Sequence, residues 1–515
     1  MTDRKTVLVI GGGLAGLTAA LHLAERGLHP IVLEADPEYP GGRVVEVDGW
    51  QFRGEHGVHG IWSPYRNLQG MLARHNIRPM FVPALEEEWI YKAGNRVKRA
   101  SVGTTIRYSP IPAPLHYLAL FLKPSFLRML GLRDWLSLPF VWGGLVWGLG
   151  VDPLAENQPL GEMTLKDIIR WWGPAVSAFM IGLTRNGLSG RPEEIPLSGY
   201  IAFIRFYTVM RRDSWIFSYM PADGGTSLID PLVKTLTSLG GEVRLGQRVT
   251  EIRRGGESWE VVTEGGKTRT WKAGQIVLGT DARSTRKLID SSPDLKAAGN
   301  EFYWPPSRET VIVRLWYRRT PNAGAESGIF TGDFKADNFF WLHRLQDQYR
   351  NWHKATGGSA IEVHFYGPPE ILAMDDVSLL ALAITDVQAA FPELRGHLVH
   401  QVLQRNQASH TLFGLGSVEQ HLGIETRWEN IFACGDWVRD PIPPLFLERA
   451  TATGILAANQ VLARNGLEPW PLIPYPPPEA FTGFIQKIMR RGRRNRRLKR
   501  SAAPAPEIIG DMEES

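Results

Sequence analysis

The stretch that decides the fold is residues 6–34, which read TVLVIGGGLAGLTAALHLAERGLHPIVLE. It begins with an unbroken apolar run, Thr6–Ile10, of the kind that forms a parallel strand buried on both faces. Apolar side chains then recur at helical spacing over Leu14–Arg26, and Gly27 ends that helix. A second apolar run, Ile31–Leu33, follows. The pattern predicts a strand–helix–strand unit and therefore a parallel sheet.

The turn between the first strand and the helix is a G-x-G-x-x-G motif. Glycines let the backbone approach a pyrophosphate, and the helix N-terminus offers free N–H groups to the anion. A carboxylate, Glu34, ends the second strand, where it can accept hydrogen bonds from an adenosine ribose. The residues expected around the phosphates are Gly11, Gly13, Leu14, Ala15 and Gly16. We therefore expect a bound dinucleotide.

Composition places the chain among globular proteins. It has 515 residues, of which 43% are hydrophobic and 22% charged, a balance that excludes disorder and a multi-span membrane protein. At roughly 100–200 residues per domain, two to four domains are expected. One cysteine, Cys434, excludes an internal disulfide and predicts a cytoplasmic protein.

Positive charge is concentrated at one end of the chain. Residues 487–500 hold nine Lys or Arg, and without them the net charge of +5 becomes −4. A basic tail of this kind can bind an anionic membrane surface. A tail that is merely solvated is the alternative, and nucleic acid is not expected because no nucleic-acid-binding module accompanies it.

Residues 108–151 are apolar and aromatic. The stretch 135–151 is uncharged but shorter than the roughly 20 residues that a spanning helix needs. Trp135, Trp142 and Trp147 suit a bilayer interface, so we expect a peripheral membrane surface there. The alternative is that this region is the buried core of a helical substrate domain.

A G-G-R segment follows the second predicted strand. Together with VLVIGGGLAGLTAALHLAERG and VLEAD, it resembles the FAD-binding start of the flavin amine oxidase and phytoene desaturase superfamily. In that superfamily the G-G-R segment lies along the FAD pyrophosphate and flavin. The resemblance implies FAD contacts at Glu34, Ala35, Gly41, Gly42 and Arg43.

Late segments resemble the same superfamily. Residues 431–436, IFACGD, are similar to its A-G-D segment, and residues 448–454, ERATATG, to the helix start that follows. QRVT contains the position whose backbone meets the adenine. The resemblance implies FAD contacts at Val249, Gly435, Asp436, Ala450 and Thr451. The chain lacks the Ser-Gly-Gly-Cys-like segment of covalent members, so FAD is expected to be non-covalent.

The resemblance implies an α/β fold (α+β overall) with a discontinuous Rossmann-type FAD-binding domain and an inserted substrate domain of mixed sheet and helices. FAD-binding segments are expected at 1–95, 226–285 and 411–465. The substrate domain is expected to contain a helical, membrane-facing region at 96–225 and a sheet at 286–410. Residues 466–515 are expected to form a Pro-rich linker and the basic tail.

Residues 55–68, EHGVHGIWSPYRNL, resemble a carotenoid branch of the superfamily, the β-ring desaturase/methyltransferases, which form aromatic end groups. The resemblance implies a lipophilic carotenoid substrate, hydride transfer to flavin, and methyl migration through carbocations. Aromatic faces stabilise a cation, and a neutral histidine or a carboxylate can take the final proton. Glu55, His56 and His59 are the candidate catalytic residues. They also fit a loop that is merely braced by hydrogen bonds, and no metal is expected.

Other functions stay open at this point. Within the enzymes they are a linear carotene desaturase, a carotenoid cis–trans isomerase and a flavin amine oxidase. A flavin- and pigment-binding protein without turnover is the alternative from a different class.

Overall fold

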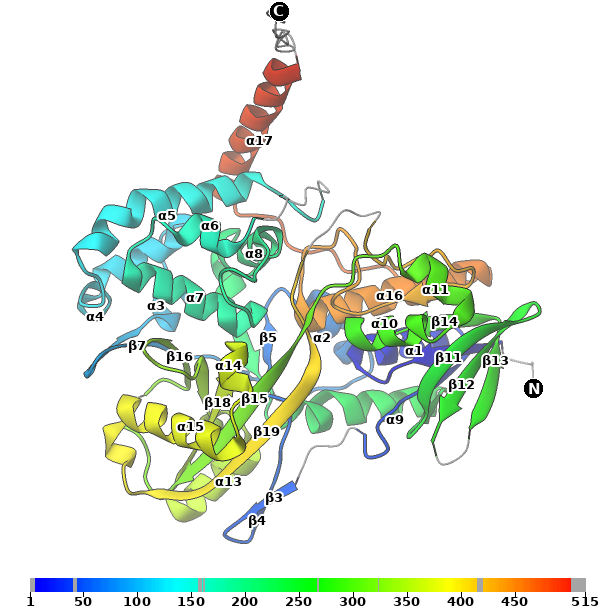
Figure 1. The fold of residues 1–515 in the computed structure, drawn as a ribbon, viewed down its shortest axis with the longest axis horizontal. Helices are drawn as coiled ribbons and strands as arrows, with labels where there is room; N and C mark the ends of the chain where they lie inside the picture. The colour runs from blue at the N-terminus through cyan, green and yellow to red at the C-terminus, as the bar shows by residue number, and fades with distance from the viewer. Residues whose placement is uncertain are drawn as a thin grey trace, which may run out of the picture.

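A computed structural model describes residues 5–39, 44–155, 160, 163–265, 268–322, 324–414 and 420–501, without side chains for Asn186 and 493–501. Gly41, Gly42 and Arg43 lie outside these residues. Figure 1 shows two lobes joined side by side, with the C-terminal helix projecting from one of them. The predicted α/β class is confirmed.

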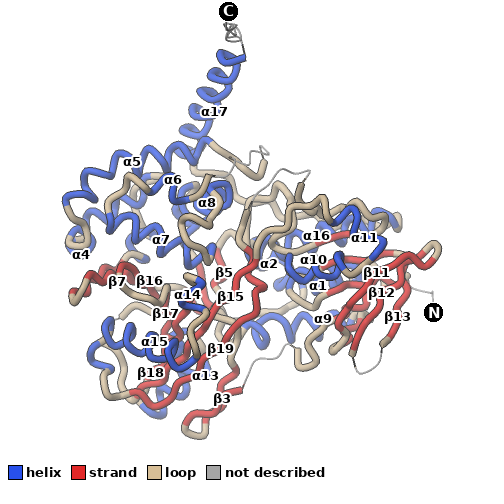
Figure 2. Tube along the Cα trace, in the orientation of Figure 1, coloured by secondary structure: helices blue, strands red, loops and turns tan. Residues whose placement is uncertain are grey.

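The first lobe is built on a five-stranded parallel sheet in the order β10-β2-β1-β14-β20. Its strands are β1 Thr6–Ile10, β2 His29–Leu33, β10 Glu242–Arg244, β14 Gln275–Leu278 and β20 Ile431–Ala433. The chain leaves and re-enters this sheet twice, so segments far apart in sequence share one hydrophobic core. Figure 2 shows the strands of this lobe with the helices around them. The predicted strand–helix–strand unit is present, with helix α1 at Leu14–Ala24.

The sequence favours a single strand over Glu242–Ile252, and that prediction is wrong. The segment splits into β10 and β11 (Arg248–Gly255), because Gly246 adopts a positive φ of 64° and turns the chain. Strand β11 pairs antiparallel with β12 Ser258–Glu264, which pairs with β13 Arg269–Ala273. The result is a separate three-stranded sheet beside the parallel one (Figure 1).

The second lobe contains a seven-stranded sheet in the order β19-β15-β18-β17-β16-β7-β8. Its strands are β7 Glu87–Ala93, β8 Arg96–Ser101, β15 Ser307–Tyr317, β16 Ser327–Gly332, β17 Asn338–Trp341, β18 Ser359–Phe365 and β19 Leu398–Thr411. All neighbours are antiparallel except β16 and β7. Strand β7 precedes the boundary expected at residue 95, so this sheet draws on the segment assigned to FAD binding.

Helices cover both faces of the seven-stranded sheet. Helix α7 (Pro174–Leu188) packs on the face that carries Trp89 and Ile329, and α15 (Asp376–Ala390) packs on the face that carries Ile90 and Phe330. Two small sheets complete the strands: β3 Val44–Val47 with β4 Trp50–Arg53, and β9 Phe217–Tyr219 between β5 Gly60–Trp62 and β6 Val82–Pro83.

The remaining α-helices are α2 Arg66–Arg74, α3 Gly103–Arg107, α4 Pro124–Leu127, α5 Leu132–Gly150, α6 Leu165–Ile169, α8 Leu197–Ile204, α9 Asp230–Ser238, α10 Ala282–Asp290, α11 Pro293–Gly299, α12 Leu342–Leu345, α13 Asp347–Thr356, α14 Pro369–Leu372, α16 Phe446–Arg464 and α17 Ala480–Ser501. Short 3-10 or π turns occur at Leu115–Leu122, Arg205–Val209, Arg212–Trp215, Gly225–Ile229 and Pro392–Leu394.

The basic end of the chain is helical, where a linker and tail were expected. Helix α17 begins beside α5: a Cβ on Gly150 would lie 2.7 Å from the Cβ of Met489, and Arg490 pairs with Asp152 at 3.3 Å. Within the described part of the chain, no helix is both long and apolar enough to cross a bilayer.

At two glycines of the first lobe, neighbouring backbone lies too close to leave room for a side chain. A Cβ on Gly454 in α16 would lie 2.6 Å from the carbonyl oxygen of Ala15 and 2.9 Å from the Cβ of Thr18. A Cβ on Gly16 would lie 2.1 Å from the carbonyl oxygen of Gly11. Helices α1 and α16 can therefore pack closely above the glycine turn only because these positions lack side chains.

We predict that Gly454→Ala lowers the free energy of unfolding by about 1–3 kcal/mol, the usual cost of overpacking a tight contact. Gly143→Ala is the matched control, because it also lies in a helix but its Cβ would meet nothing within 4 Å. Chemical denaturation of both variants measures the difference. Equal stabilities would contradict the close packing of α1 on α16.

Candidate functional site

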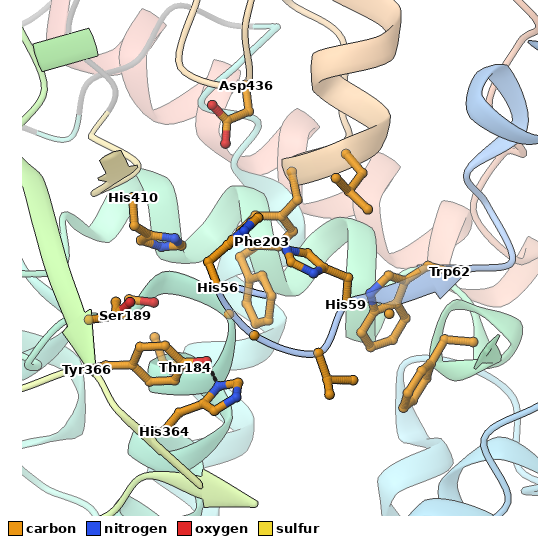
Figure 3. A pocket seen from close by; sticks show the side chains of 18 of the residues that line it. His56, His59, Trp62, Thr184, Ser189, Phe203, His364, Tyr366, His410 and Asp436 are labelled. Carbon is orange, nitrogen blue, oxygen red and sulfur yellow. Dashed lines mark hydrogen bonds between the residues drawn. The ribbon is translucent and has the colours of Figure 1, made fainter. Parts of the chain in front are cut away.

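A cavity of about 560 Å³ joins the two lobes. One end is formed by the α1 N-terminus (Gly13–Ala15), residues 279–281 after β14, and residues 435–437 after β20. The other end is formed by the loop 56–60 and by the seven-stranded sheet (Figure 3). We call this space the central cavity. Because parallel strands end at the same edge of a sheet, β1, β14 and β20 all deliver their following loops to it.

The α1 end of the cavity fits a pyrophosphate. Helix α1 has Gly13 at its N-cap and no side chain capping its free N–H groups. A Cβ on Gly13 would meet no atom within 4 Å, so the space above this turn is open. Gly11 has a φ of 99°, which only glycine adopts without strain. A bare helix N-terminus facing an open space is the arrangement that binds phosphate.

Glu34, where the sequence predicts the adenosine ribose, lies beyond this glycine turn. Glu34 accepts hydrogen bonds from the backbone N–H groups of Gly12 at 2.7 Å and Asp36 at 2.9 Å. A second hollow next to it is lined by Ala35, Pro37, Leu245, Gly246, Gln247, Arg248, Glu264 and Gly265. Val249, the position predicted to meet the adenine, follows this lining directly in sequence without being part of it.

The late segment contributes backbone and one carboxyl group. Gly435 has a φ of 147°, and its N–H donates to the Thr453 hydroxyl at 3.0 Å. Asp436 lines the cavity, and burial raises the pKa of its carboxyl to about 6 against the opposing charge of Arg449. Ala450 also lines the cavity.

Two residues of the late segment do not face the cavity. The Thr451 hydroxyl donates to the carbonyl oxygen of Leu447 inside α16. Cys434 is fully buried in the core, and burial raises the pKa of its thiol to about 12. A thiol in this setting is inert, which agrees with the expected non-covalent binding of flavin.

His56 and His59 both line the central cavity. Their rings pack edge to face at 4.8 Å between centroids, and Figure 3 places them between Asp436 and Tyr366. Burial lowers the pKa of both imidazoles, that of His59 to about 3 with a further contribution from His56. Both histidines are therefore neutral at pH 7, the form that accepts a proton.

Glu55 is placed differently from the two histidines. Its carboxyl group does not line the cavity but accepts hydrogen bonds from the backbone N–H of Gly224 at 2.6 Å and from Gln346 at 3.3 Å. Burial raises the pKa of Glu55 to about 8. These contacts tie the start of the histidine loop to the turn before α9.

Buried polar side chains of the seven-stranded sheet hold the histidine loop from the other side. Glu362 accepts from the backbone N–H of Val58 at 2.9 Å, and Asn406 donates to the carbonyl oxygen of His56 at 3.1 Å. Arg314 pairs with Glu362 at 2.7 Å and also donates to the carbonyl oxygen of Glu55. The loop is thus fixed by hydrogen bonds to its backbone.

Sequence reasoning missed this polar set. The signal was present in SAIEVHFY (359–366), where Glu362, His364 and Tyr366 alternate with apolar residues. Alternation of this kind puts the three polar side chains on one face of a strand. Because strand β18 is buried throughout, that face must be an internal polar site.

The rest of the cavity wall combines apolar and aromatic side chains with polar ones. The polar side chains include those of Glu87, Glu88, Thr184, Ser189, Thr208, Ser327, Gln407 and His410. The aromatic residues of the wall include Trp62, Tyr65, Tyr200, Phe203, Trp215, Phe217, Tyr219 and Phe340. Trp62 lies against Phe217 with ring centroids 4.5 Å apart. Among the residues with described positions, no group of three or more His, Cys, Asp or Glu side chains is arranged to hold a metal ion.

The open glycine turn on a parallel sheet, joined to an aromatic cavity in a second lobe, defines an FAD-dependent oxidoreductase. Residues 9–75 match the NAD(P)-binding Rossmann-like domain. Residues 172–462, more than half of the chain, match the flavin containing amine oxidoreductases. The protein belongs to this family, which confirms the superfamily and the cofactor inferred from the motifs.

Two relatives match almost the whole chain. The carotenoid phi-ring synthase of Streptomyces griseus is 25% identical over 90% of this chain and 89% of its own length. The carotenoid phi-ring synthase of Chlorobaculum tepidum is 22% identical over 92% and 91%. Among solved structures, cyclohexylamine oxidase from Brevibacterium oxydans superposes with a TM-score of 0.63 over 90% of this chain and 100% of that one, at 13% identity, and so shares the fold.

We predict that Gly13→Val yields a folded protein without flavin. The Cβ of the new side chain meets no protein atom within 4 Å, but the side chain fills the space that a pyrophosphate needs above the α1 N-terminus. The flavin absorbance of the purified protein and its thermal unfolding measure the two properties. Gly143→Val, which also points into open space but lies in α5, is the control and should stay yellow.

Flavin bound normally to Gly13→Val would contradict this position for the pyrophosphate. Acid denaturation of the wild-type protein should release its flavin into solution. Flavin that stays with the denatured chain would contradict non-covalent binding.

Proposed function

We propose that the protein is an FAD-dependent carotenoid desaturase that converts a β-ring into an aromatic end group with migration of one methyl group. The observation that carries the proposal is the central cavity, which leads from the cofactor cradle into an apolar, aromatic wall. Relatives named as carotenoid phi-ring synthases, which match this chain over nine-tenths of its length, support it. A carotenoid end group is an apolar ring that such a wall accommodates.

The chemistry sets what the chain must provide. Turning a cyclohexene end group into a benzenoid ring removes two hydrides and two protons and shifts one geminal methyl. Bound FAD supplies the oxidation by accepting hydride. The chain must therefore exclude water, stabilise the carbocation on which the methyl migrates, and accept protons.

The aromatic side chains of the cavity wall exclude water and stabilise the carbocation. Trp62, Phe203 and Phe217 present faces to the cavity from β5, α8 and β9. A cation–π contact contributes up to about 2 kcal/mol when desolvated. A cation stabilised in this way lasts long enough for the methyl group to migrate.

His56 and His59 are the proposed proton acceptors on the cofactor side of the substrate. Both are neutral because of burial, and their loop is fixed by Glu55, Glu362 and Asn406. A base held in one orientation contributes about 10²–10⁴-fold to a proton transfer. The domain boundaries and FAD contacts stated above remain part of this proposal, including those of Gly41, Gly42 and Arg43.

A linear carotene desaturase is the second candidate. The 15-cis-phytoene desaturase of Capsicum annuum is 26% identical over 49% of this chain and 42% of its own length. That match spans about half of either protein, whereas the phi-ring synthases match nearly all of both. The β-ring reaction is therefore the favoured one.

The proposal extends to a membrane surface through which a lipophilic substrate enters. Helix α5 exposes Leu132, Trp135, Leu136 and Phe140. Helix α17, which starts beside α5 and projects from the same lobe, exposes Phe481, Phe484 and Ile488 (Figure 1). Exposed apolar side chains next to a basic helix are typical of a surface that lies on an anionic bilayer.

We expect expression in cells that accumulate β-carotene to produce a pigment four hydrogens lighter per converted ring, detected by mass spectrometry and by the aromatic signals of the end group. The flavin-free Gly13→Val variant is the matched control and should leave β-carotene unchanged. Cells that accumulate acyclic carotenes separate the candidates. Conversion of acyclic but not of β-ring carotenoids would replace the favoured function with linear desaturation.

The membrane surface is tested by two variants in vesicle flotation. Replacing the six basic residues of 493–500 by serine removes six positive charges at roughly 1 kcal/mol each near an anionic leaflet, so binding to anionic vesicles should fall while binding to neutral vesicles stays. The double substitution Leu136→Ser and Phe140→Ser should weaken both, because those side chains insert among acyl chains. Equal effects of the two variants on both lipids would contradict this division.

A further inference from the structure

Three side chains at the end of β18 form a hydrogen-bonded chain beside the central cavity, and the proposed function gives none of them a part in proton transfer. They are Tyr366, His364 and Glu362. We propose that Tyr366 is a second proton acceptor of the enzyme, with His364 and Glu362 as the relay behind it. The inference rests on the proposed function, since forming one aromatic ring requires two protons to leave.

The geometry of the relay is short and continuous. The Tyr366 hydroxyl lies 2.7 Å from His364 Nδ1, and His364 Nε2 lies 2.6 Å from Glu362 Oε1. Tyr366 and His364 line the cavity, and Figure 3 shows their hydrogen bond on the side of His56 opposite Asp436. Glu362 lies behind them and is fully enclosed.

Glu362 determines which nitrogen of His364 carries the hydrogen between the two side chains. Its carboxylate accepts from Arg314 at 2.7 Å and from the backbone N–H of Val58 at 2.9 Å. Burial alone would raise its pKa, but Arg314 and the His364 hydrogen bond outweigh burial and lower the pKa to about 2. Glu362 is therefore ionised and can only accept, so the hydrogen on His364 sits on Nε2.

The tautomer of His364 then determines the state of Tyr366. The relay requires a His364 ring whose single hydrogen is on Nε2; Nδ1 is then unprotonated, and the Tyr366 O–H donates to it. Burial raises the pKa of Tyr366, which keeps the phenol protonated in the resting protein. Its oxygen then keeps lone pairs for other partners, of which Asn338 Nδ2 is a distant one at 3.4 Å.

The position of Tyr366 is set by charges behind it. The Tyr366 backbone N–H donates to Asp337 at 2.7 Å, and Asp337 pairs with Arg185 of α7 at 2.8 Å. On the other side, His364 lies against the histidine loop, since a Cβ on Gly57 would be 3.0 Å from His364 Cε1. The relay and the histidine loop thus share one wall of the cavity.

The proton transfer balances as follows. A ring C–H bond of the substrate cation breaks, and its electron pair becomes a ring C=C bond that neutralises the cation. The proton goes to the Tyr366 oxygen, while the phenol hydrogen moves to His364 Nδ1. His364 becomes an imidazolium whose charge is balanced by the Glu362 carboxylate, so no charge is left unpaired in the cavity.

Tyr366→Phe is the principal test because it removes one hydroxyl and keeps the ring. The variant should retain FAD and unfold at the wild-type temperature. Anaerobic flavin reduction by β-carotene in detergent micelles should begin at close to the wild-type rate. Release of the aromatic pigment should fall by about 10²–10⁴-fold, and a pigment two hydrogens lighter than β-carotene should accumulate. His364→Gln should produce the same intermediate.

Tyr317→Phe is the matched control, because Tyr317 is a buried tyrosine of β15 in the same sheet, is not part of the cavity lining, and its hydroxyl has no hydrogen-bond partner among the described residues. It should leave pigment release unchanged. ¹⁵N NMR of histidine-labelled protein, with His364→Gln for assignment, gives a readout independent of turnover. It should show His364 neutral and protonated on Nε2.

The outcomes separate the two proposals. If the wild-type protein converts no β-ring carotenoid at all, the proposed function fails. If the wild type converts it and Tyr366→Phe does so at the same rate, the relay is overturned while the function stands. A resting His364 protonated on Nδ1 would overturn it as well, because Tyr366 would then have no acceptor for its hydrogen.

Discussion

The structure depends on the approach of backbone to backbone at the glycine turn between β1 and α1. A side chain on Gly16 would overlap the carbonyl oxygen of Gly11, and a side chain on Gly454 would overlap that of Ala15. Because none is present, α1 lies close to its own strand and to α16, and its N-terminus opens toward the loops that follow β14 and β20. An anionic cofactor bound there faces the cavity from which substrate must approach. The loop 56–60 and the second lobe form the rest of the wall of that cavity.

Charge in the cavity is arranged by burial. Among the groups that line the cavity, burial keeps His56, His59 and the Tyr366 phenol neutral and raises the pKa of Glu87 to about 7, while the pair of Arg314 and Glu362 lies behind the histidine loop. Neutral bases can take protons without first attracting water into an apolar site. Hydrogen bonds to the loop backbone and to His364 offset the desolvation cost of burying this ion pair. One pair of charges therefore positions both proposed sets of proton acceptors.

The first lobe was predictable because its signals are local. The strand at Thr6–Ile10, the glycine turn and the strand at Ile431–Ala433 are contiguous runs with one interpretation each. The strand predicted over Glu242–Ile252 was wrong because the turn at Gly246 has only one glycine to indicate it, and the sheet that β7 joins is decided by its partner β16. The wall of the site was beyond local reasoning. Val58 and Glu362 are 304 residues apart, and only the fold brings them together. The same holds for Glu55, which is not part of the cavity lining: its carboxyl group accepts from Gly224, 169 residues away, and lies 3.9 Å from His59 Nδ1.

The central claim is that one cavity holds the flavin and a β-ring carotenoid together. Anaerobic mixing of the purified flavoprotein with β-carotene in anionic liposomes tests it most directly, with flavin absorbance and pigment mass followed in the same sample. The account predicts that the oxidised flavin bleaches and that one ring-dehydrogenated pigment molecule, two hydrogens lighter, appears for each flavin reduced. Flavin that stays oxidised with β-carotene but bleaches with an acyclic carotene or a soluble amine would contradict the account.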